Sequence, residues 1–140
     1  MNKNPIVLID NDPDDVEIFQ FTLSDLGIKN KLIWLGDAEQ ALAQLQQLAV
    51  QPFIIFCDMN MPKIDGLTLK TAIDNDPALR KKSIPFIFFT TSADPNIVET
   101  AYTKLSIQGF FLKAVDSAVN RATIGRILDY WQHCIHPNSG

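Results

Sequence analysis

Four polar segments of this sequence carry side chains that could bind a metal ion or an anion, or supply a nucleophile, and each directly follows a short apolar run. The segments are Asp10-Asn11-Asp12, Asp58-Met59-Asn60, Thr90-Thr91-Ser92 and Lys113-Ala114. Carboxylates can ligate a cation or act as nucleophiles, while an ammonium and a hydroxyl can stabilise an anion. Each residue alone has a simpler explanation, such as a helix cap for Asp12. The chemistry therefore depends on whether the fold brings the four segments together.

Five apolar runs predict the strands that would position these segments. They are Ile6–Ile9, Lys31–Leu35, Phe53–Cys57, Phe86–Phe89 and Gly109–Leu112. Continuous apolar runs are typical of parallel strands buried on both faces, and the spacing between runs leaves room for a helix each time. The sequence therefore predicts an α/β protein of five βα units. Only the second strand ends without a polar side chain, at Leu35-Gly36.

Capping residues and apolar stripes predict the helices between these strands. The expected helices run from the Asp12 cap and Pro13 to Gly27, from the Asp37 cap to Leu48, over Leu67–Asn75, from Asp94-Pro95 to Leu105, and over about 116–133. Two stripes are expected to be buried: Val98, Ala101, Tyr102 and Leu105, and then Val119, Thr123, Ile127 and Trp131. Residues 75–85, NDPALRKKSIP, are expected to form a long surface loop, and Pro137–Gly140 a frayed end.

Composition limits the class of protein. A chain of 140 residues with 46% hydrophobic residues predicts one domain, residues 1–140, with its own core and no output domain. The net charge of −4 and the pI near 5.0 argue against binding to nucleic acid or to an anionic membrane. Two cysteines, Cys57 and Cys134, cannot build a disulfide scaffold, and no signal peptide or membrane span is expected from the sequence. A cytoplasmic location is therefore expected.

With the four polar segments in this order, residues 5–135 resemble the response-regulator receiver domain of two-component signalling. The matching pieces are VLIDNDPDD, FCDMNMPKIDGL, FIFFTTSADP and GFFLKA. The resemblance implies a single doubly wound, flavodoxin-like (βα)5 domain with a parallel sheet in the order 2-1-3-4-5. In that order the four polar segments meet at the carboxyl edge of the sheet.

The resemblance also implies roles for these residues. Asp58 would be the phosphoacceptor, receiving a phosphoryl group from a sensor histidine kinase or a histidine phosphotransfer protein. Mg²⁺ would be the cofactor, because it prefers oxygen ligands and retains several waters. Its ligands would be the side chains of Asp58 and Asn11, the backbone carbonyl of Asn60, and Asp10 through water.

Three further residues would stabilise the phosphoryl group and transmit its presence. Lys113 would pair with one phosphoryl oxygen and the Thr90 hydroxyl would donate to another. Phe110 matches the aromatic residue of the family that turns inward on phosphorylation. A downstream protein would then bind a face made of the helix before the fifth strand, that strand and the last helix. The sequence leaves open whether the protein forms a homodimer.

Two positions depart from the family pattern. Asn11 stands where the family usually has a second acid, so the site loses one negative charge and should bind Mg²⁺ more weakly. Ala114 stands where the family usually has a proline in a cis bond. Because a cis bond before alanine costs ~2.5–4 kcal/mol, either this bond is trans or the loop is strained.

Two other function classes fit part of the sequence. A haloacid-dehalogenase-like phosphohydrolase would use Asp10 as its nucleophile, but would leave Asp58 unexplained. A receiver-like interaction module that takes no phosphoryl group would explain Asn11 and Ala114. No independent turnover is expected beyond self-phosphorylation and slow self-dephosphorylation. The group His133-Cys134-x-His136 resembles a metal site without a fourth ligand, and Trp34 and Trp131 are expected to be packing residues.

Overall fold

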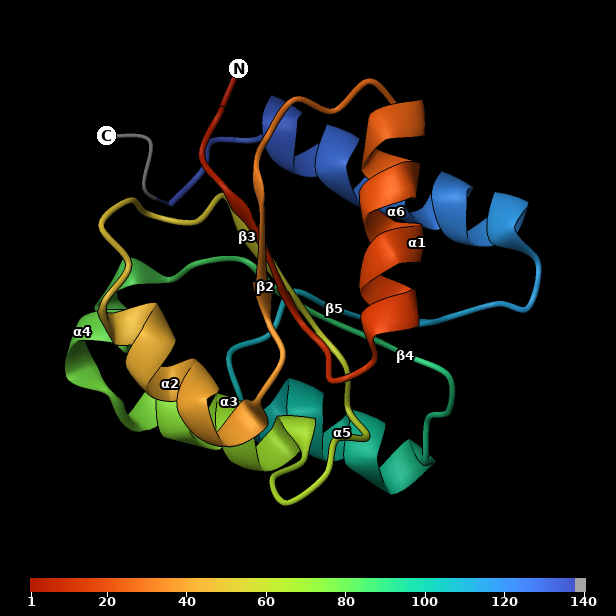
Figure 1. The fold of residues 1–140 in the computed structure, drawn as a ribbon. Helices are drawn as coiled ribbons and strands as arrows, with labels where there is room; N and C mark the ends of the chain where they lie inside the picture. Colours follow the sequence, from red (N-terminus) through yellow and green to blue (C-terminus); the bar gives the residue numbers. More distant parts are fainter. Residues whose placement is uncertain (138–140) are drawn as a thin grey trace.

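The structure is a computed structural model that describes residues 1–137, so the predicted frayed end beyond Pro137 lies outside the described residues. Strands and helices alternate along this chain, with one extra helix before the fourth strand (Figure 1). In chain order the elements are β1 (Ile6–Ile9), α1 (Pro13–Asp25), β2 (Leu32–Leu35), α2 (Ala38–Gln46), β3 (Ile54–Cys57), α3 (Gly66–Asn75), α4 (Pro77–Lys82), β4 (Phe86–Thr90), α5 (Pro95–Lys104), β5 (Gly109–Leu112) and α6 (Ser117–His133).

The five strands form one parallel sheet in the order β2-β1-β3-β4-β5, which confirms the predicted doubly wound, flavodoxin-like α/β fold. Helices α1 and α6 cover one face of the sheet, and α2, α3, α4 and α5 cover the other (Figure 1). The chain reverses direction across the sheet between β1 and β3. Such a reversal leaves a crevice beyond the carboxyl ends of the strands, where ligands bind in open α/β sheets.

Alternate strand residues enter separate hydrophobic clusters on the two faces. Ile6 and Leu8 of β1 pack toward α1 and α6, while Val7 and Ile9 pack toward the other helices. Both sets are almost completely buried. Each such side chain contributes roughly 1.5–3 kcal/mol through burial, which explains why the central strands β1 and β3 are uninterrupted apolar runs rather than alternating ones.

An aspartate caps the start of all six helices of the described residues. The caps are Asp12, Asp37, Asp65, Asp76, Asp94 and Asp116, and each accepts a backbone hydrogen bond from the first turn. A carboxylate at this position satisfies an unpaired N–H and interacts favourably with the helix dipole. The acidic residues that follow the strands without capping a helix, Asp10 and Asp58, therefore stand out as the ones that need another explanation.

The expected surface loop over 75–85 is wrong, because this segment contains α4. Asp76 accepts a hydrogen bond from the Leu79 N–H at 3.0 Å, and Pro77 occupies the first helical position. Leu79 is buried in the core, and Ser83 ends the helix in the left-handed conformation at φ 51°. An Asp-Pro pair starts a turn or a helix equally well, and the burial of Leu79 favours the helix here.

Two predicted stripes also need correction. Tyr102 of α5 and Val119 of α6 are exposed, although both were expected to be buried. The buried residues of α6 are Ile124, Ile127 and Leu128. The contacts made with the sheet, rather than the apolar residues available, therefore determine which face of each helix is buried. Within the described residues no helix is both long and apolar enough to cross a membrane.

Candidate functional site

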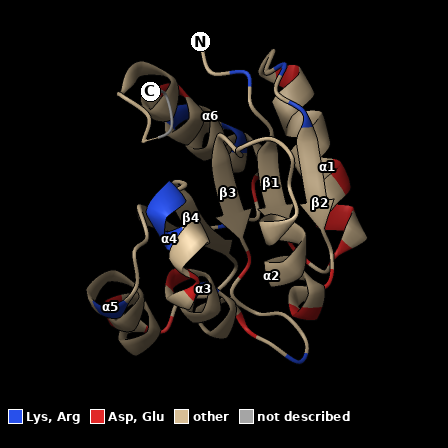
Figure 2. Cartoon of the chain, turned by 90° about the vertical axis from the view of Figure 1, so that its left-hand side faces the viewer, with Lys and Arg blue, Asp and Glu red and all other residues tan. Residues whose placement is uncertain are grey.

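The strand register places the predicted site residues at one edge of the sheet. Ile9 of β1 lies beside Cys57 of β3, and the Asp58 N–H continues this pairing by donating to the Ile9 carbonyl at 2.9 Å. Asp10 and Asp58 therefore leave neighbouring strands side by side. Figure 2 shows acidic residues directly below the arrowhead of β3. The basic residues at the end of α4 lie apart from them.

Lys113 comes to this edge from β5. Its N–H donates to the Thr90 carbonyl at 2.7 Å, which aligns the ends of β4 and β5. Its ammonium then reaches across the carboxyl ends of the strands and forms ion pairs with Asp10 at 3.0 Å and Asp15 at 3.1 Å. The structure thus brings Lys113 of the fifth strand end to Asp10 of the first, and adds Asp15 of α1.

Asp10 is the most deeply buried acid of this group, with 1% of its surface exposed. Its Oδ1 accepts a hydrogen bond from the Asp12 N–H at 2.9 Å, and its Oδ2 faces Lys113. Burial raises the pKa of the Asp10 carboxyl above its ordinary value, and Asp58 acts in the same direction, although the Asp12 N–H and Lys113 oppose it. The two acids therefore repel each other across a site that holds a single lysine.

The acids that disfavour the charged form of Asp10 favour the charged form of Lys113. Burial alone would lower the pKa of the Lys113 ammonium, but the carboxylates of Asp10, Asp58 and Asp15 outweigh it and raise that pKa. Lys113 is therefore held in its charged form. The neighbouring Cys57 is completely buried, and burial raises the pKa of its thiol, which removes it as a competing nucleophile.

Asp58 is half-buried, and among the described residues its carboxylate takes part in no hydrogen bond or ion pair. The loop that follows it folds back tightly. The Gly66 N–H donates to the Met59 carbonyl at 2.8 Å, and a Cβ at residue 66 would lie only 2.8 Å from the Asp58 carbonyl. Glycine at 66 therefore allows the loop to close while the Asp58 side chain stays accessible.

The remaining predicted residues differ in exposure. Asn11 and Asn60 are exposed, whereas Thr90 is completely buried. The Asn60 amide donates to the Ser92 hydroxyl at 3.2 Å and more weakly to the Thr90 hydroxyl at 3.5 Å. The Thr90 hydroxyl accepts in this long contact, so its own O–H hydrogen stays available for an acceptor such as an anion.

These donors fit a magnesium ion. The residues predicted as ligands offer two carboxylates, from Asp10 and Asp58, an amide oxygen from Asn11 and a backbone carbonyl from Asn60, and hard oxygen donors of this kind are what Mg²⁺ prefers. Both Asp10 oxygens already accept hydrogen bonds, which suits the water-mediated contact expected for it. The His133-Cys134-x-His136 group is different: no set of three metal-ligating His, Cys, Asp or Glu side chains occurs in the described part of the chain, and His136 is buried against Phe53.

The loop after β5 is built without the proline of the family pattern. No cis peptide bond occurs in the described residues, so the bond before Ala114 is trans. The Asn120 side chain holds both backbone groups of Ala114, accepting from its N–H at 2.6 Å and donating to its carbonyl at 2.9 Å. Asn120 therefore fixes the chain directly after Lys113.

Phe110, the predicted switch residue, is half-buried on β5. Its ring centroid lies 5.4 Å from that of Phe88, and it packs against the core cluster beneath α3 and α5. Two contributors to the site were missed. These are Asn120 and Trp34, whose indole donates to the Asp10 carbonyl at 2.6 Å. Only their hydrogen-bonding capacity could have indicated them.

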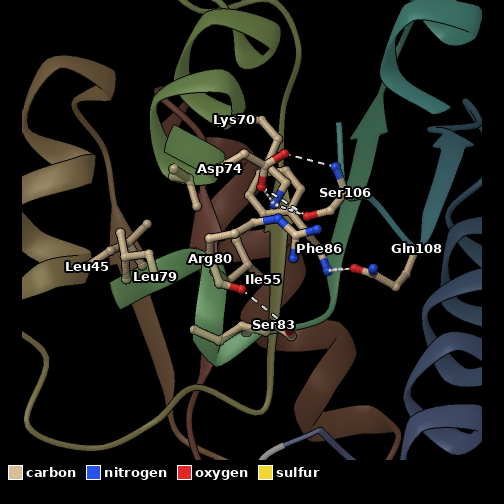
Figure 3. A pocket seen from close by; sticks show the side chains of 12 residues that line it. Leu45, Ile55, Lys70, Asp74, Leu79, Arg80, Ser83, Phe86, Ser106 and Gln108 are labelled. Carbon is tan, nitrogen blue, oxygen red and sulfur yellow. Dashed lines mark hydrogen bonds and ion pairs between the residues drawn. The ribbon is translucent and has the colours of Figure 1, made fainter. Parts of the chain in front are cut away.

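A second buried lysine–aspartate pair lies at the amino-terminal end of β4 and β5. Lys70 of α3 forms an ion pair with Asp74 at 2.7 Å, and Asp74 also accepts from the Ser106 N–H and hydroxyl at 2.8 and 2.9 Å. The Lys70 ammonium lies 4.8 Å from the centroid of the Phe86 ring. Figure 3 shows this cluster beside a cavity of about 230 Å³.

Comparison with known proteins agrees with this geometry. Residues 6–124 match the family described as the response regulator receiver domain. The chain belongs to this family. The receiver domain is the part of a two-component system that interacts with histidine kinases or phosphotransfer proteins and with downstream targets, and it binds Mg²⁺ generally. This membership leaves no support for the haloacid-dehalogenase-like alternative, whose nucleophile would be the buried, lysine-paired Asp10.

Individual relatives support the same assignment. The response regulator Rcp1 of Synechocystis sp. is 32% identical over 102 residues, which cover 69% of this chain and 68% of that protein. The crystal structure of the Mn²⁺-bound form of response regulator Rcp1 has a TM-score of 0.80 at 27% identity and covers 96% of this chain and 97% of that one. The phosphorylated cyanobacterial phytochrome response regulator RcpA has the same fold, with a TM-score of 0.86 at 24% identity over 99% of this chain and 100% of that one.

Proposed function

We propose that this receiver domain accepts a phosphoryl group on Asp58, from a phosphohistidine of a sensor kinase or phosphotransfer protein, and thereby switches a protein-binding surface. The observation that carries the proposal is the contrast between the two acids at the sheet edge. Asp10 is buried and has both oxygens engaged, whereas the half-exposed Asp58 carboxylate has no partner among the described residues. Of these two acids, Asp58 is the one with an accessible carboxylate, and Lys113 lies near enough to interact with it.

The residues divide the work of phosphoryl transfer. A carboxylate oxygen of Asp58 forms a bond to phosphorus while the bond from phosphorus to the histidine nitrogen breaks, and the imidazole leaves with the electron pair and takes up a proton. Lys113, held charged by the acids around it, neutralises a phosphoryl oxygen. The Thr90 hydroxyl, which only accepts in its 3.5 Å contact with Asn60, donates to another oxygen.

The site needs a cation because its charge is unbalanced. Asp10, Asp15 and Asp58 oppose one lysine, and the incoming phosphoryl group adds further negative charge. The side chains of Asp58 and Asn11 and the Asn60 carbonyl would hold Mg²⁺, and Asp10 would act through water. When bound, the ion neutralises the charge between the acids and the phosphoryl oxygens. Asn11 keeps an oxygen donor but removes one charge, so it is expected to weaken binding.

The output surface of this proposal is formed by α5, β5 and α6. Lys104 is the last residue of α5, Ile107 lies between α5 and β5, and Phe110 follows on the strand. Movement of Thr90 toward the phosphoryl group would free space next to Phe110, because the two residues belong to the paired strands β4 and β5. Phosphorylation would then shift the population between two forms of this face.

Labelling with acetyl phosphate and Mg²⁺ tests the proposal. Intact mass measurement of the full chain should show one added phosphoryl group, and Asp58→Asn should abolish it. Asp129→Asn, which alters an exposed acid of α6, should label like the wild type. Label that persists in Asp58→Asn would overturn the assignment. Steady hydrolysis of a phosphate ester would point to a phosphohydrolase, and absence of label on a folded protein that binds Mg²⁺ would point to an interaction module.

A further inference from the structure

The exposed edge strand β2 supplies one hydrogen bond to the site from an unexpected residue. Trp34 keeps 44% of its surface exposed, although it is a large aromatic side chain. Its indole Nε1–H donates to the backbone carbonyl of Asp10 at 2.6 Å. A tryptophan placed for packing alone would bury its ring, whereas this ring lies along the surface and uses its one polar atom.

Gly36 makes this arrangement of the ring possible. A Cβ at residue 36 would lie 2.9 Å from Cζ2 and 3.2 Å from Nε1 of Trp34. These atoms belong to a rigid ring that cannot shift at one end only, so a larger residue at 36 would push the indole away from Asp10. Glycine directly after β2 therefore leaves the space that the Trp34 ring occupies.

The bond acts where the sheet gives the acidic turn little support. The backbone link from the Asp10 N–H to the Leu35 carbonyl is long at 3.3 Å, and the indole adds a shorter link just beyond it. The other contacts of Asp10, from the Asp12 N–H and Lys113, both reach its carboxylate. Trp34 therefore holds the one group that those contacts leave free to turn, the peptide that joins Asp10 to Asn11.

We propose that Trp34 is a positioning residue of the phosphoacceptor site, which sets the orientation of Asn11 toward the cation by holding the Asp10 carbonyl. This inference rests on the proposed function, because Asn11 matters only if the site binds Mg²⁺. Loss of the indole N–H leaves both carboxylate contacts of Asp10 in place. Its effect is therefore on cation affinity, with little effect on the reaction once the cation is bound.

The sharpest test replaces Trp34 with 3-benzothienylalanine, whose ring has the same shape but carries sulfur in place of the N–H. Calorimetric titration of the full chain with Mg²⁺ should give a dissociation constant about two- to tenfold higher, as a neutral hydrogen bond of ~0.5–1.5 kcal/mol implies. The Mg²⁺ concentration for half-maximal acetyl phosphate labelling should rise by the same factor, while the maximal rate changes less than about twofold. The same replacement at Trp131 on α6 is the matched control and should leave the affinity unchanged.

Two further measurements separate positioning from general loosening. In the absence of cation, the amide NMR signals of Asn11 and Asp12 should move in the Trp34 variant and keep their positions in the Trp131 control. Gly36→Ala should weaken Mg²⁺ binding in the wild type and add little to the benzothienyl variant, because both changes remove the same bond.

The outcomes distinguish this inference from the proposed function. A wild type that binds Mg²⁺ and labels on Asp58, with an unchanged dissociation constant in the Trp34 variant, would overturn the role of Trp34 alone. A lower maximal rate with unchanged affinity would overturn it as well. A wild type that neither binds Mg²⁺ nor labels would instead overturn the proposed function.

Discussion

Two buried lysine–aspartate pairs lie at opposite ends of the parallel strands, and they differ in what surrounds the carboxylate. At the amino end, Asp74 accepts hydrogen bonds from Lys70, from the Ser106 N–H and from its hydroxyl. Burial alone would raise the pKa of Asp74, but these donors outweigh it and hold that pKa below its ordinary value. At the carboxyl end, Asp10 is more deeply buried and faces a second acid, and its pKa is raised.

The pKa values of the two lysines also shift in opposite directions. Burial lowers the pKa of the Lys70 ammonium even though Asp74 opposes it, because one carboxylate balances one charge. Lys113 is surrounded by three carboxylates, and its pKa is raised. A balanced pair is suited to holding α3 against the segment that leads into β5, whereas an unbalanced cluster is suited to receiving a cation or an anion.

The largest expected effect comes from breaking the balanced pair. Asp74→Ala leaves Lys70 buried without its partner and should lower the free energy of unfolding by ~3–5 kcal/mol in urea titrations near neutral pH. Acetyl phosphate labelling of the fraction that stays folded should be unchanged, because Asp74 lies at the other end of the strands.

The matched control removes both charges at once. Lys70→Met combined with Asp74→Leu should recover most of the lost stability, since a buried ion pair can be replaced by apolar side chains at little cost. A double variant as unstable as Asp74→Ala would show that the hydrogen bonds to Ser106, and not the unpaired charge, account for the loss.

How far the sequence predicts this molecule depends on the kind of residue. Asp10, Asp58, Thr90 and Lys113 each follow an apolar run, and parallel strands bring such positions together, so the candidate site could be predicted without a structure. The Lys70–Asp74 pair could not, because a lysine and an aspartate four residues apart are typical of an exposed helix face. Only packing of α3 against β4 buries them.

Side chains that act through the backbone were beyond prediction for a related reason. Trp34 binds the carbonyl of Asp10 on the neighbouring strand, and Asn120 binds both backbone groups of Ala114 in the loop before its helix. No sequence pattern encodes where those groups point. The prediction of a loop over the α4 segment was wrong for a different reason. Its Asp-Pro start and its basic residues suit a turn, and only the buried Leu79 favours a helix. The polar residues that follow the strands could be predicted from the sequence, whereas the positions of Trp34, Asn120 and α4 depend on tertiary contacts.

The second prediction uses pH to separate the two acids. Carboxyl ¹³C NMR should give a midpoint above the ordinary aspartate value for Asp10 and below it for Asp74. A raised pKa contributes stability below the unfolded-state value that is lost as pH rises through the folded one, and a lowered pKa does the reverse. Asp10 should therefore favour the fold in acid, whereas Asp74 should favour it at neutral pH and lose that contribution below its ordinary pKa.

Lys113→Met sharpens this test. Without the ammonium, the Asp10 pKa should rise further, so the variant should lose more stability near neutral pH than near pH 4. Each unit of added shift corresponds to ~1.4 kcal/mol between those conditions. Lys104→Met, which removes an exposed charge at the end of α5, is the control. An equal loss at both pH values would show that Lys113 contributes packing rather than charge.

The smallest expected effect concerns the signal that leaves the charged end of the sheet. The Thr90 hydroxyl is buried and holds only the 3.5 Å contact from Asn60, and the Phe110 ring already packs 5.4 Å from Phe88. A charge-assisted bond from Thr90 to a phosphoryl oxygen contributes ~1.5–3 kcal/mol, enough to turn a minor state of a few per cent into the major one. Beryllofluoride, a phosphoryl mimic, should therefore shift the NMR signals of Phe110 and Ile107 by small amounts in the wild type and less in Thr90→Ala, while Asp58 can still be labelled.

The control is Ser92→Ala, which removes the neighbouring hydroxyl that contacts the same Asn60 amide and should keep the full response. Equal shifts in the wild type and Thr90→Ala would show that the signal reaches β5 by another route, and the Lys113 N–H bond to the Thr90 carbonyl would be the next contact to test.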